Sequence, residues 1–430
     1  MNRAPPGPRY APYALAVLFV AYVLAFVDRQ VLNLLVEPIK HDTGLSDTQI
    51  SLLQGLSFAI FLSIGGLPIG RLIDTGRRTR LLAIGIAVWS LMTGAFGLTR
   101  VFPIMLLSRI GVSVGEATMT PSAYSLLGDY FPPRRLGLAV GLFSMGGYLG
   151  SGLALILGSA ALALLPTRDM MAPPIGIVHP WQAIFLGLVP VGLAIALWVA
   201  TLREPARRDS EATGVPDRRA VIAYFRSAWR PLLGVNLAVG FTTMAAYGLL
   251  AWIPALITRK YGLLPAQAGW RLGIVLILAC CTGTLLAGVI GDRLCGRGIA
   301  GGRLIVMSAA LAATLPFAAM APRAESIGWL LAGLAPLLFF LSAAIGCGPA
   351  LLQQITPNRL RGVQHSLAVL AANLLGLGVG PTIVALGTEH LFGGAQAVGI
   401  SLSWILPLCL MIALAISIAT RPSYAKTPVY

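Results

Sequence analysis

The chain alternates between long apolar runs and short polar segments. A helix of about 20 mostly apolar residues is long enough to cross a bilayer. Twelve runs reach that length, at residues 13–36, 49–73, 81–99, 102–129, 138–165, 182–202, 231–255, 266–292, 304–321, 328–355, 365–389 and 397–420. The longest polar stretch, residues 203–230, is too short for a soluble domain. The pattern predicts an all-α membrane protein with twelve transmembrane helices.

The composition fits a chain that lies mostly in lipid. Of 430 residues, 57% are hydrophobic and 11% are charged, whereas about 25% are charged in soluble domains. The net charge of +16 would indicate nucleic acid in a soluble protein. With both termini in the cytoplasm, however, 22 of the 31 Lys and Arg residues lie on the cytoplasmic side and 7 opposite, as the positive-inside rule requires. We therefore expect the lipid bilayer around the chain, and no nucleic acid.

Several other classes of protein are excluded by missing motifs. The first apolar run is too long for a signal peptide and lacks an A-x-A cleavage site, so we interpret it as an uncleaved span. The five cysteines form no C-x-x-C pair, which predicts neither a disulfide framework nor a metal site. No Ser-His, zinc-ligand or paired-aspartate motif is present, so we expect no catalytic residue, no cofactor and no enzyme activity.

Two short motifs recur at nearly the same offset along the chain. Gly70-x-x-x-Asp74, at the end of the second predicted span, returns 218 residues later as Gly288-x-x-x-Asp292. Pro132-x-Arg134-x-x-Gly137, after the fourth, returns 225 residues later as Pro357-x-Arg359-x-x-Gly362. Parallel repeats of six spans are typical of one large class of transporters.

The repeats divide the chain into three parts. We predict a six-helix bundle over residues 1–202, a cytoplasmic linker loop over 203–230 and a second six-helix bundle over 231–430. The linker has seven Arg and two Pro, which is typical of a solvated connection.

The loop after the second span resembles a family signature. Gly70-Arg-Leu-Ile-Asp74-Thr-Gly-Arg-Arg78 is similar to the signature of the major facilitator superfamily, except that Thr75 replaces the usual basic residue and the glycine is displaced to Gly76. The second copy keeps Asp292-Arg293. The resemblance covers essentially the whole chain. It implies two pseudo-symmetric six-helix bundles that alternate access around a midplane cavity.

Further segments match one branch of that superfamily more closely. They are Asp28-Arg29-x-x-Leu32-Asn33, Leu45-Ser-Asp-x-Gln49-x-x-Leu52-Leu-x-Gly55, Arg109-x-Gly111-x-x-x-Gly115-Glu116-Ala117-x-x-x-Pro121, Asp129-x-Phe131-Pro132-x-x-Arg135 and Asn373-Leu-x-Gly376-x-Gly378-x-Gly380-Pro381. Together they resemble the Spinster-type transporters of lysolipids and sphingolipids. Glu389 stands where that branch more often has Asp. The resemblance implies an amphiphilic, anionic, lipid-like solute.

Four charged residues interrupt the predicted spans, Asp28 and Arg29 in the first and Arg109 and Glu116 in the fourth. A charge at the bilayer centre costs at least ~2.5–3.5 kcal/mol, so such groups indicate function. With a rise of ~1.5 Å per residue, Asp28 and Arg109 lie about 12 Å and about 10 Å below the outer ends of their helices. An Asp28–Arg109 ion pair is therefore possible. It is either a permanent bond that pins two helices or a working part of a transport cycle.

Glu116 lies about 20 Å from the outer end of its span by the same rise, so we expect it to stand apart from the other three charges. It shares a helix face with Arg109, Ser113 and Thr120. Burial disfavours the ionised carboxylate and a nearby Arg favours it, so a change of partner switches its proton affinity. We predict Asp28 and Glu116 as the proton-coupling residues. The alternative for Glu116 is a protonated carboxyl that only packs helices.

An arginine suits an anionic substrate because its planar fork binds a carboxylate or phosphate at two points. We predict substrate contacts from Arg29, Arg109, Asn33, Tyr247 and Asn373. Spans seven to twelve contain no deep charge. A cavity that is charged on one half and apolar on the other suits an amphiphile, although small polar groups also serve helix packing.

Charged residues near the cytoplasmic span ends have a different predicted role. Ion pairs among them would latch the inner side shut across the two halves and break when it opens. We assign this conformational gate to Asp74, Arg78, Asp129, Arg135, Asp292 and Arg293.

These observations predict a proton-coupled secondary transporter, and the resemblance to the Spinster-type branch implies an amphiphilic, anionic, lipid-like solute. The alternatives are a carrier of small organic anions, since Asp28-Arg29-x-x-Leu32-Asn33 also resembles anion symporters, and a multidrug-type exporter. Arg outnumbers Lys 28 to 3, which is typical of GC-rich bacteria. We therefore expect a bacterial inner membrane. We also expect a monomer.

Overall fold

The computed structural model describes residues 10–166, 169–172, 176–207, 218–299, 301–357 and 360–427. In this part of the chain, eleven helices are long and apolar enough to cross a membrane, which confirms the prediction of an all-α membrane protein. The chain packs as two compact units. The N-terminal unit comprises Met1–Ser210 and Leu263–Ile274, and the C-terminal unit comprises Glu211–Gly262 and Val275–Tyr430.

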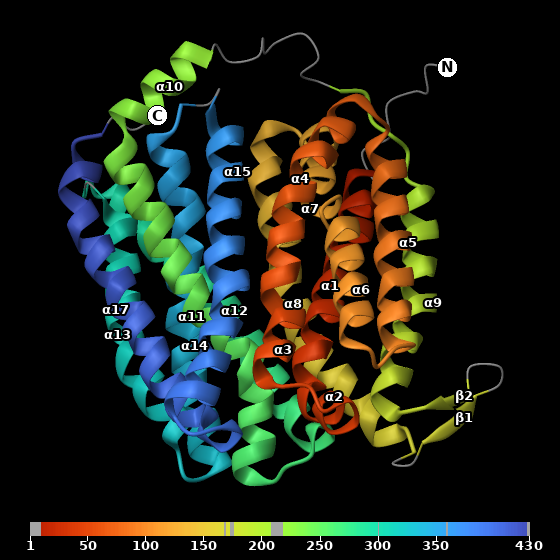
Figure 1. Cartoon of the computed structure of the whole chain (residues 1–430). Coiled ribbons are helices and arrows are strands. Elements are labelled where there is room, and N and C mark those ends of the chain that lie inside the picture. Colours follow the sequence, from red (N-terminus) through yellow and green to blue (C-terminus); the bar gives the residue numbers. More distant parts are fainter. Residues whose placement is uncertain are drawn as a thin grey trace. The chain divides into compact units, whose positions relative to one another are not determined.

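The N-terminal unit is built mainly from long helices (Figure 1). Its elements are α1 (Tyr10–Leu34), α2 (Val36–Thr43), α3 (Asp47–Ser51), the π-helix η1 (Leu52–Leu56), α4 (Ser57–Thr75), α5 (Arg78–Gly97), α6 (Phe102–Glu116), α7 (Met119–Tyr130), α8 (Pro133–Leu164), β1 (Met170–Ala172), β2 (Gly176–Val178) and α9 (Pro180–Ala200). The two strands form an antiparallel hairpin beside the start of α9. They lie between the predicted spans 138–165 and 182–202.

The C-terminal unit contains α10 (Arg218–Ser227), α11 (Trp229–Tyr261), α12 (Pro265–Gly296), α13 (Gly302–Met320), the 3-10 helix η2 (Ala321–Arg323), α14 (Ile327–Ile355), α15 (Arg361–Ala371), η4 (Ala372–Val379), α16 (Gly380–Leu386), η5 (Gly387–Leu391), η6 (Ala395–Ala397) and α17 (Val398–Ala425). The first residues of α12 pack with the N-terminal unit, where the Ser159 hydroxyl donates to the Pro265 carbonyl over 2.8 Å. η4 and η5 are π-helices within the eleventh predicted span.

The predicted linker is not entirely loop. α10 lies inside it, and the Tyr224 hydroxyl donates to the carbonyl of Ile355 at the end of α14 over 2.9 Å. Between the arginines of this segment, residues 220–225 form an unbroken apolar and aromatic run without Gly or Pro, so nothing in the run opposes a helix. The expectation of a wholly irregular linker was therefore wrong for these residues.

Small residues bring the helices of the N-terminal unit into backbone contact. A Cβ atom on Gly115 of α6 would lie 2.7 Å from the Gly85 carbonyl oxygen and 2.8 Å from the Trp89 nitrogen, both on α5. A Cβ on Gly150 of α8 would lie 2.5 Å from the Val23 carbonyl oxygen of α1. Close approach through small residues is how helices associate in lipid, where burial of apolar surface gives no drive between helices. These contacts hold α6 against α5 and α1 against α8, and α1 and α6 carry the four charged residues of the spans.

The fourth predicted span is broken in the structure. α6 ends at Glu116 and α7 begins at Met119, so neither piece is long enough to count as a span. Pro121 explains the break, because it has no N–H for the Ala117 carbonyl four residues earlier. One continuous helix over residues 102–129 was therefore the wrong prediction, and Glu116 is the last residue before the break.

Candidate functional site

The first ion pair of the site joins α1 to α6. Asp28 Oδ1 lies 3.5 Å from Arg109 Nη1, and both side chains are at most 2% exposed. The Thr93 hydroxyl of α5 donates to the other carboxylate oxygen of Asp28. The predicted Asp28–Arg109 pair is thus confirmed, and a third helix holds the acid in place.

The second ion pair joins the same two helices. Arg29 Nε donates to Glu116 Oε2 over 2.6 Å, and Arg29 Nη2 also contacts that oxygen. The depth of Glu116 along the helix had suggested that it stands apart from the other three charges. This was wrong, because Glu116 is paired with Arg29. The long Arg29 side chain spans the difference in depth, which an estimate from Cα positions cannot include.

Phe58 of α4 lies between the two arginines. The guanidinium carbon of Arg29 is 4.7 Å from the centre of its ring, and that of Arg109 is 5.2 Å from it. The ring is fully buried. An aromatic face attracts a guanidinium more strongly where water is excluded. Phe58 thus touches both ion pairs and links them physically.

The π-helix η1 supplies a further contact. Arg109 Nε donates to the carbonyl of Leu53, within η1, over 3.2 Å. In a π-helix the backbone bonds run to i+5, as the Ser57 N–H does to Leu52. Such turns often mark functional positions. Here the irregular turn offers a backbone carbonyl to a buried guanidinium.

Asn33 lies one turn of α1 beyond Arg29, in a buried amide chain. Its amide nitrogen donates to Gln30 over 2.8 Å, and its oxygen accepts from Gln54 Nε2 over 3.0 Å. This chain connects α1 to η1 beside the ion pairs. The structure thus brings together four predicted residues with Asn33 in one unit.

The cluster is electrically balanced but not fully bonded. Two acids face two arginines, so its formal charge is zero. Within the described part of the chain, Glu116 Oε1 and Arg109 Nη2 are buried without a hydrogen-bond partner. The Arg29 side chain is 17% exposed, against 0% for Glu116 and 1% for Arg109. Arg29 is therefore the most exposed side chain of the four charged residues.

The two predicted contacts in the C-terminal unit lie on α11 and η4, and both side chains are half-buried. They are Tyr247 and Asn373. The elements pack tightly, since a Cβ on Gly376 would lie 2.6 Å from the Thr243 hydroxyl. These residues occupy neighbouring elements of the same unit.

Three of the predicted gate residues, Arg78, Asp129 and Asp292, make ion pairs inside a single unit. Arg78 contacts Asp129 and donates from Nε to Glu204 Oε1 over 2.7 Å, all in the N-terminal unit. Asp292 Oδ1 lies 2.5 Å from Arg303 Nη2, within the C-terminal unit. Arg135 is exposed. The side chain of Asp74 lies outside the described residues.

Glu204 is held by the start of α5. The Thr79 N–H donates to its carboxylate over 2.9 Å and the Thr79 hydroxyl over 3.0 Å. Burial on its own raises the pKa of this carboxyl, but the Thr79 N–H and the Arg78 guanidinium outweigh burial and hold the pKa below its ordinary value. Glu204 is thus ionised at neutral pH and caps the helix that follows the signature loop.

A comparison with protein families shows to which family the chain belongs. The profile of the Major Facilitator Superfamily matches residues 18–381. The chain belongs to this superfamily. It is therefore a multi-pass integral membrane protein and a secondary transporter, not an enzyme.

Several transporters are similar to this chain over most of their length. An MFS-type efflux pump of Mycolicibacterium smegmatis is 28% identical over 409 residues, covering 91% of this chain and 88% of the relative. The 3-(3-hydroxy-phenyl)propionate transporter of Escherichia coli is 29% identical over 334 residues, 75% of each. A probable L-galactonate transporter of Escherichia coli is 26% identical over 330 residues, 73% of this chain and 69% of the relative.

Crystal structures of a bacterial homologue of the human lysosomal transporter Spinster share the fold. The inward-facing unoccupied form matches with a TM-score of 0.80 at 23% identity, covering 98% of this chain and 97% of that one. The inward-facing occupied form matches with a TM-score of 0.80 at 24% identity, covering 97% of this chain and 97% of that one. The resemblance to a Spinster-type major facilitator is thereby confirmed for the fold.

Sequence reasoning missed three residues of this superfamily member that touch its charged groups. They are Phe58, Thr93 and Glu204. Phe58 and Thr93 are an ordinary apolar and a small polar residue in spans, so their types give no indication of a charged neighbour. The position of Glu204 did indicate a charged partner, because it is an acid directly after a span whose flanks are otherwise basic.

Proposed function

We propose that this transporter couples protons to the movement of an organic anion, and that Glu116 and the anion compete for Arg29. The observation that carries the proposal is the buried Glu116 carboxylate on a partly exposed Arg29. An arginine that is already saturated by a carboxylate has little to offer a second anion. Removing the first carboxylate charge is therefore the step that creates the binding site.

Protonation of Glu116 is that step. It changes the formal charge of the four-residue cluster from zero to +1, in surroundings where unbalanced charge is costly. An anionic substrate that binds Arg29 restores neutrality. The proton and the anion thus favour each other's binding in the same conformation, which is the thermodynamic content of coupling.

The remaining predicted residues have supporting roles in this proposal. Asp28 holds Arg109 and shares the proton-coupling role, and Phe58 transmits changes between the pairs. Asn33, Tyr247 and Asn373 contact the body of the substrate. Asp74, Arg78, Asp129, Arg135, Asp292 and Arg293 form the gate of an alternating-access cycle. We propose a monomer with cytoplasmic termini in a bacterial inner membrane.

The relatives support small organic anions as the solute. Their names include transporters of 3-(3-hydroxy-phenyl)propionate and L-galactonate, both of which are carboxylates. The sequence motifs in the first and fourth spans support a second class, anionic amphiphiles such as lysophospholipids, because of their likeness to the Spinster-type branch.

Purified protein in liposomes with an internal pH dye tests the proposal. Addition of a transported acid should move protons and acid together in the parent protein, for a panel that contains aromatic carboxylates, sugar acids and lysophospholipids. Glu116→Gln and Asp28→Asn should abolish the dependence of transport on the pH gradient. Transport by both variants at the parental rate and with the parental proton dependence would contradict the assignment.

A further inference from the structure

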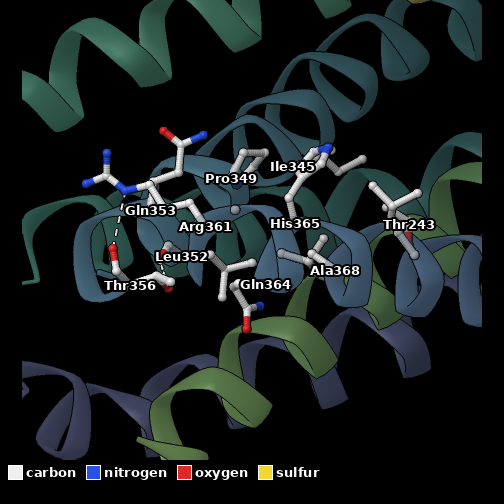
Figure 2. A pocket seen from close by; sticks show the side chains of 14 residues that line it. Thr243, Ile345, Pro349, Leu352, Gln353, Thr356, Arg361, Gln364, His365 and Ala368 are labelled. Carbon is white, nitrogen blue, oxygen red and sulfur yellow. Dashed lines mark hydrogen bonds between the residues drawn. The ribbon is translucent and has the colours of Figure 1, made fainter. Parts of the chain in front are cut away.

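The C-terminal unit contains a cavity of its own, of about 170 Å³, between α11, α14 and the helix formed by α15 and η4. Figure 2 shows the side chains that line it. The volume is comparable to the roughly 150 Å³ cavity that holds one benzene molecule in an engineered protein core. The space therefore suits a single ring or a short branched chain.

The lining changes from polar to apolar along α15. Arg361, Gln364 and Ala368 follow at helical spacing, so they present one face of the helix. α14 runs in the opposite sense, from apolar Ile345 to Thr356 at the polar end. Figure 2 places Arg361 and Thr356 together, linked by the 3.2 Å bond from Arg361 Nε to the Thr356 carbonyl, and Ile345 away from them. The cavity is thus amphipathic.

Gln364 is the unusual residue of this lining. It is 2% exposed, and neither its amide nitrogen nor its amide oxygen has a hydrogen-bond partner in the described part of the chain. Exchanging the amide oxygen and nitrogen would not change this, because both atoms lack a partner. A buried amide without partners is costly, and native proteins seldom retain one without a ligand or water to satisfy it.

A ligand that satisfies both atoms needs an acceptor and a donor side by side. A carboxylate with a hydroxyl on the neighbouring carbon has this arrangement, since the carboxylate accepts from the amide nitrogen and the hydroxyl donates to the amide oxygen. Arg361, one turn away on the same face, favours a negative charge at this end. The apolar walls beyond suit an aromatic ring or a short aliphatic group.

We propose that this cavity is a binding site for small apolar 2-hydroxy acids, held by Gln364 at the carboxylate end. The site gives the C-terminal unit a specificity element for the acid, and only the statement that the acid is the carried solute rests on the proposed function. The bound acid leaves Gln364 satisfied and places its body against Ile345 and Ala368.

The test measures binding separately from transport. We use parent protein in lipid nanodiscs with 2-hydroxy-3-phenylpropionate, and compare 3-phenylpropionate, which lacks the hydroxyl, and lactate, which lacks the ring. Calorimetry should show that both comparison acids bind at least about tenfold more weakly, because each loses one part of the site. Equal binding of 2-hydroxy-3-phenylpropionate and 3-phenylpropionate would overturn the proposal.

Variants locate the site. Gln364→Leu keeps a similar volume and removes the amide, so it should fold and should weaken binding at least about tenfold. Ala368→Phe fills the apolar end without changing the amide, and it should weaken binding by a similar factor. Gln396→Leu replaces an exposed glutamine of the same unit and serves as the matched control. Parental affinity in both Gln364→Leu and Ala368→Phe would show that only water fills the cavity.

Failure of this proposal is distinguishable from failure of the proposed function. If Glu116→Gln transports like the parent while Gln364→Leu still loses binding, the cavity stands and the coupling assignment falls. If Arg29→Gln abolishes binding while Gln364→Leu does not, the acid binds in the N-terminal unit and the cavity proposal is overturned.

Discussion

Arg29 of α1 donates to Glu116 at the last residue of α6, over 2.6 Å between Nε and Oε2. The carboxylate is therefore bound directly beside a helix break that Pro121 imposes. The backbone at a break has fewer internal hydrogen bonds than a helix interior, so it can move at lower cost. The acid with the proposed proton-coupling role thus lies where a change of charge can be converted into a change of helix geometry.

Arg29→Lys should separate charge from shape at this position. Lysine keeps the positive charge but lacks the planar fork and lies less well on Phe58. We expect affinity for the carried anion to fall about 10- to 100-fold, while Glu116 keeps a charged partner. Substrate titrations in liposomes at fixed pH measure this. Unchanged affinity would mean that Arg29 does not touch the substrate.

The Asp28–Arg109 pair is either a permanent bond or a part of the transport cycle. A double-mutant cycle first measures how much the pair contributes to stability. Asp28→Asn leaves Arg109 buried with its main partner gone and should lower stability by about 3–5 kcal/mol. Asp28→Asn combined with Arg109→Gln should recover much of that loss, because no unpaired charge remains. Thermal unfolding of Asp28→Asn, Arg109→Gln and the double variant in detergent tests this.

The transport assay then decides the role of the pair. A permanent bond predicts that the recovered double variant transports with the parental proton dependence. A coupling role predicts a stable protein whose transport no longer responds to the pH gradient.

Phe58→Leu should weaken both ion pairs at once. The buried ring faces two guanidinium groups, and each such contact contributes about 0.5–2 kcal/mol. We expect a loss of about 2–4 kcal/mol in stability with the lost packing included. Phe143→Leu is the matched control, because Phe143 is equally buried but stacks on Tyr22. Equal losses in both variants would show that the arginine contacts add nothing.

The sequence predicted much of this site because charges in lipid are conspicuous. Asp28 and Arg109 were paired correctly from helix depth alone, because their estimated depths of about 12 Å and about 10 Å are nearly equal. Helix depth did not predict the Arg29–Glu116 pair, because the long Arg29 side chain covers the difference in depth between the two residues. The break after α6 was also missed, although Pro121 was visible, because proline is tolerated inside membrane-spanning helices and does not by itself end one.

Gly115→Ala tests whether the close approach of α5 and α6 is needed. The added Cβ would lie 2.7 Å from the Gly85 carbonyl oxygen and 2.8 Å from the Trp89 nitrogen, and both are backbone atoms that cannot turn aside. We expect a loss of about 1–3 kcal/mol in stability from overpacking. Gly128→Ala on α7 is the control, since nothing lies within 4 Å of its Cβ position. That control should be neutral or gain about 0.5–1 kcal/mol.

Glu204 gives a prediction for the pH dependence of stability. Its folded pKa is below its ordinary value, so the unfolded chain binds the proton more readily than the folded protein. The stabilisation is complete above the unfolded-chain pKa of about 4.3 and is lost as the pH falls through the lower folded value. Glu204→Gln should cost about 1–3 kcal/mol at pH 7 and should flatten the acid side of the stability curve.

Thermal unfolding from pH 7 to pH 3 measures both effects of Glu204→Gln. The control is Glu325→Gln, because Glu325 is exposed, and it should leave the curve unchanged. Arg78 also contacts Asp129 and the Pro205 carbonyl, at 3.1 Å for the latter, so the helix start should remain folded in the Glu204 variant. A Glu204→Gln variant whose stability falls with acid as steeply as the parent's would show that another group controls the acid limb.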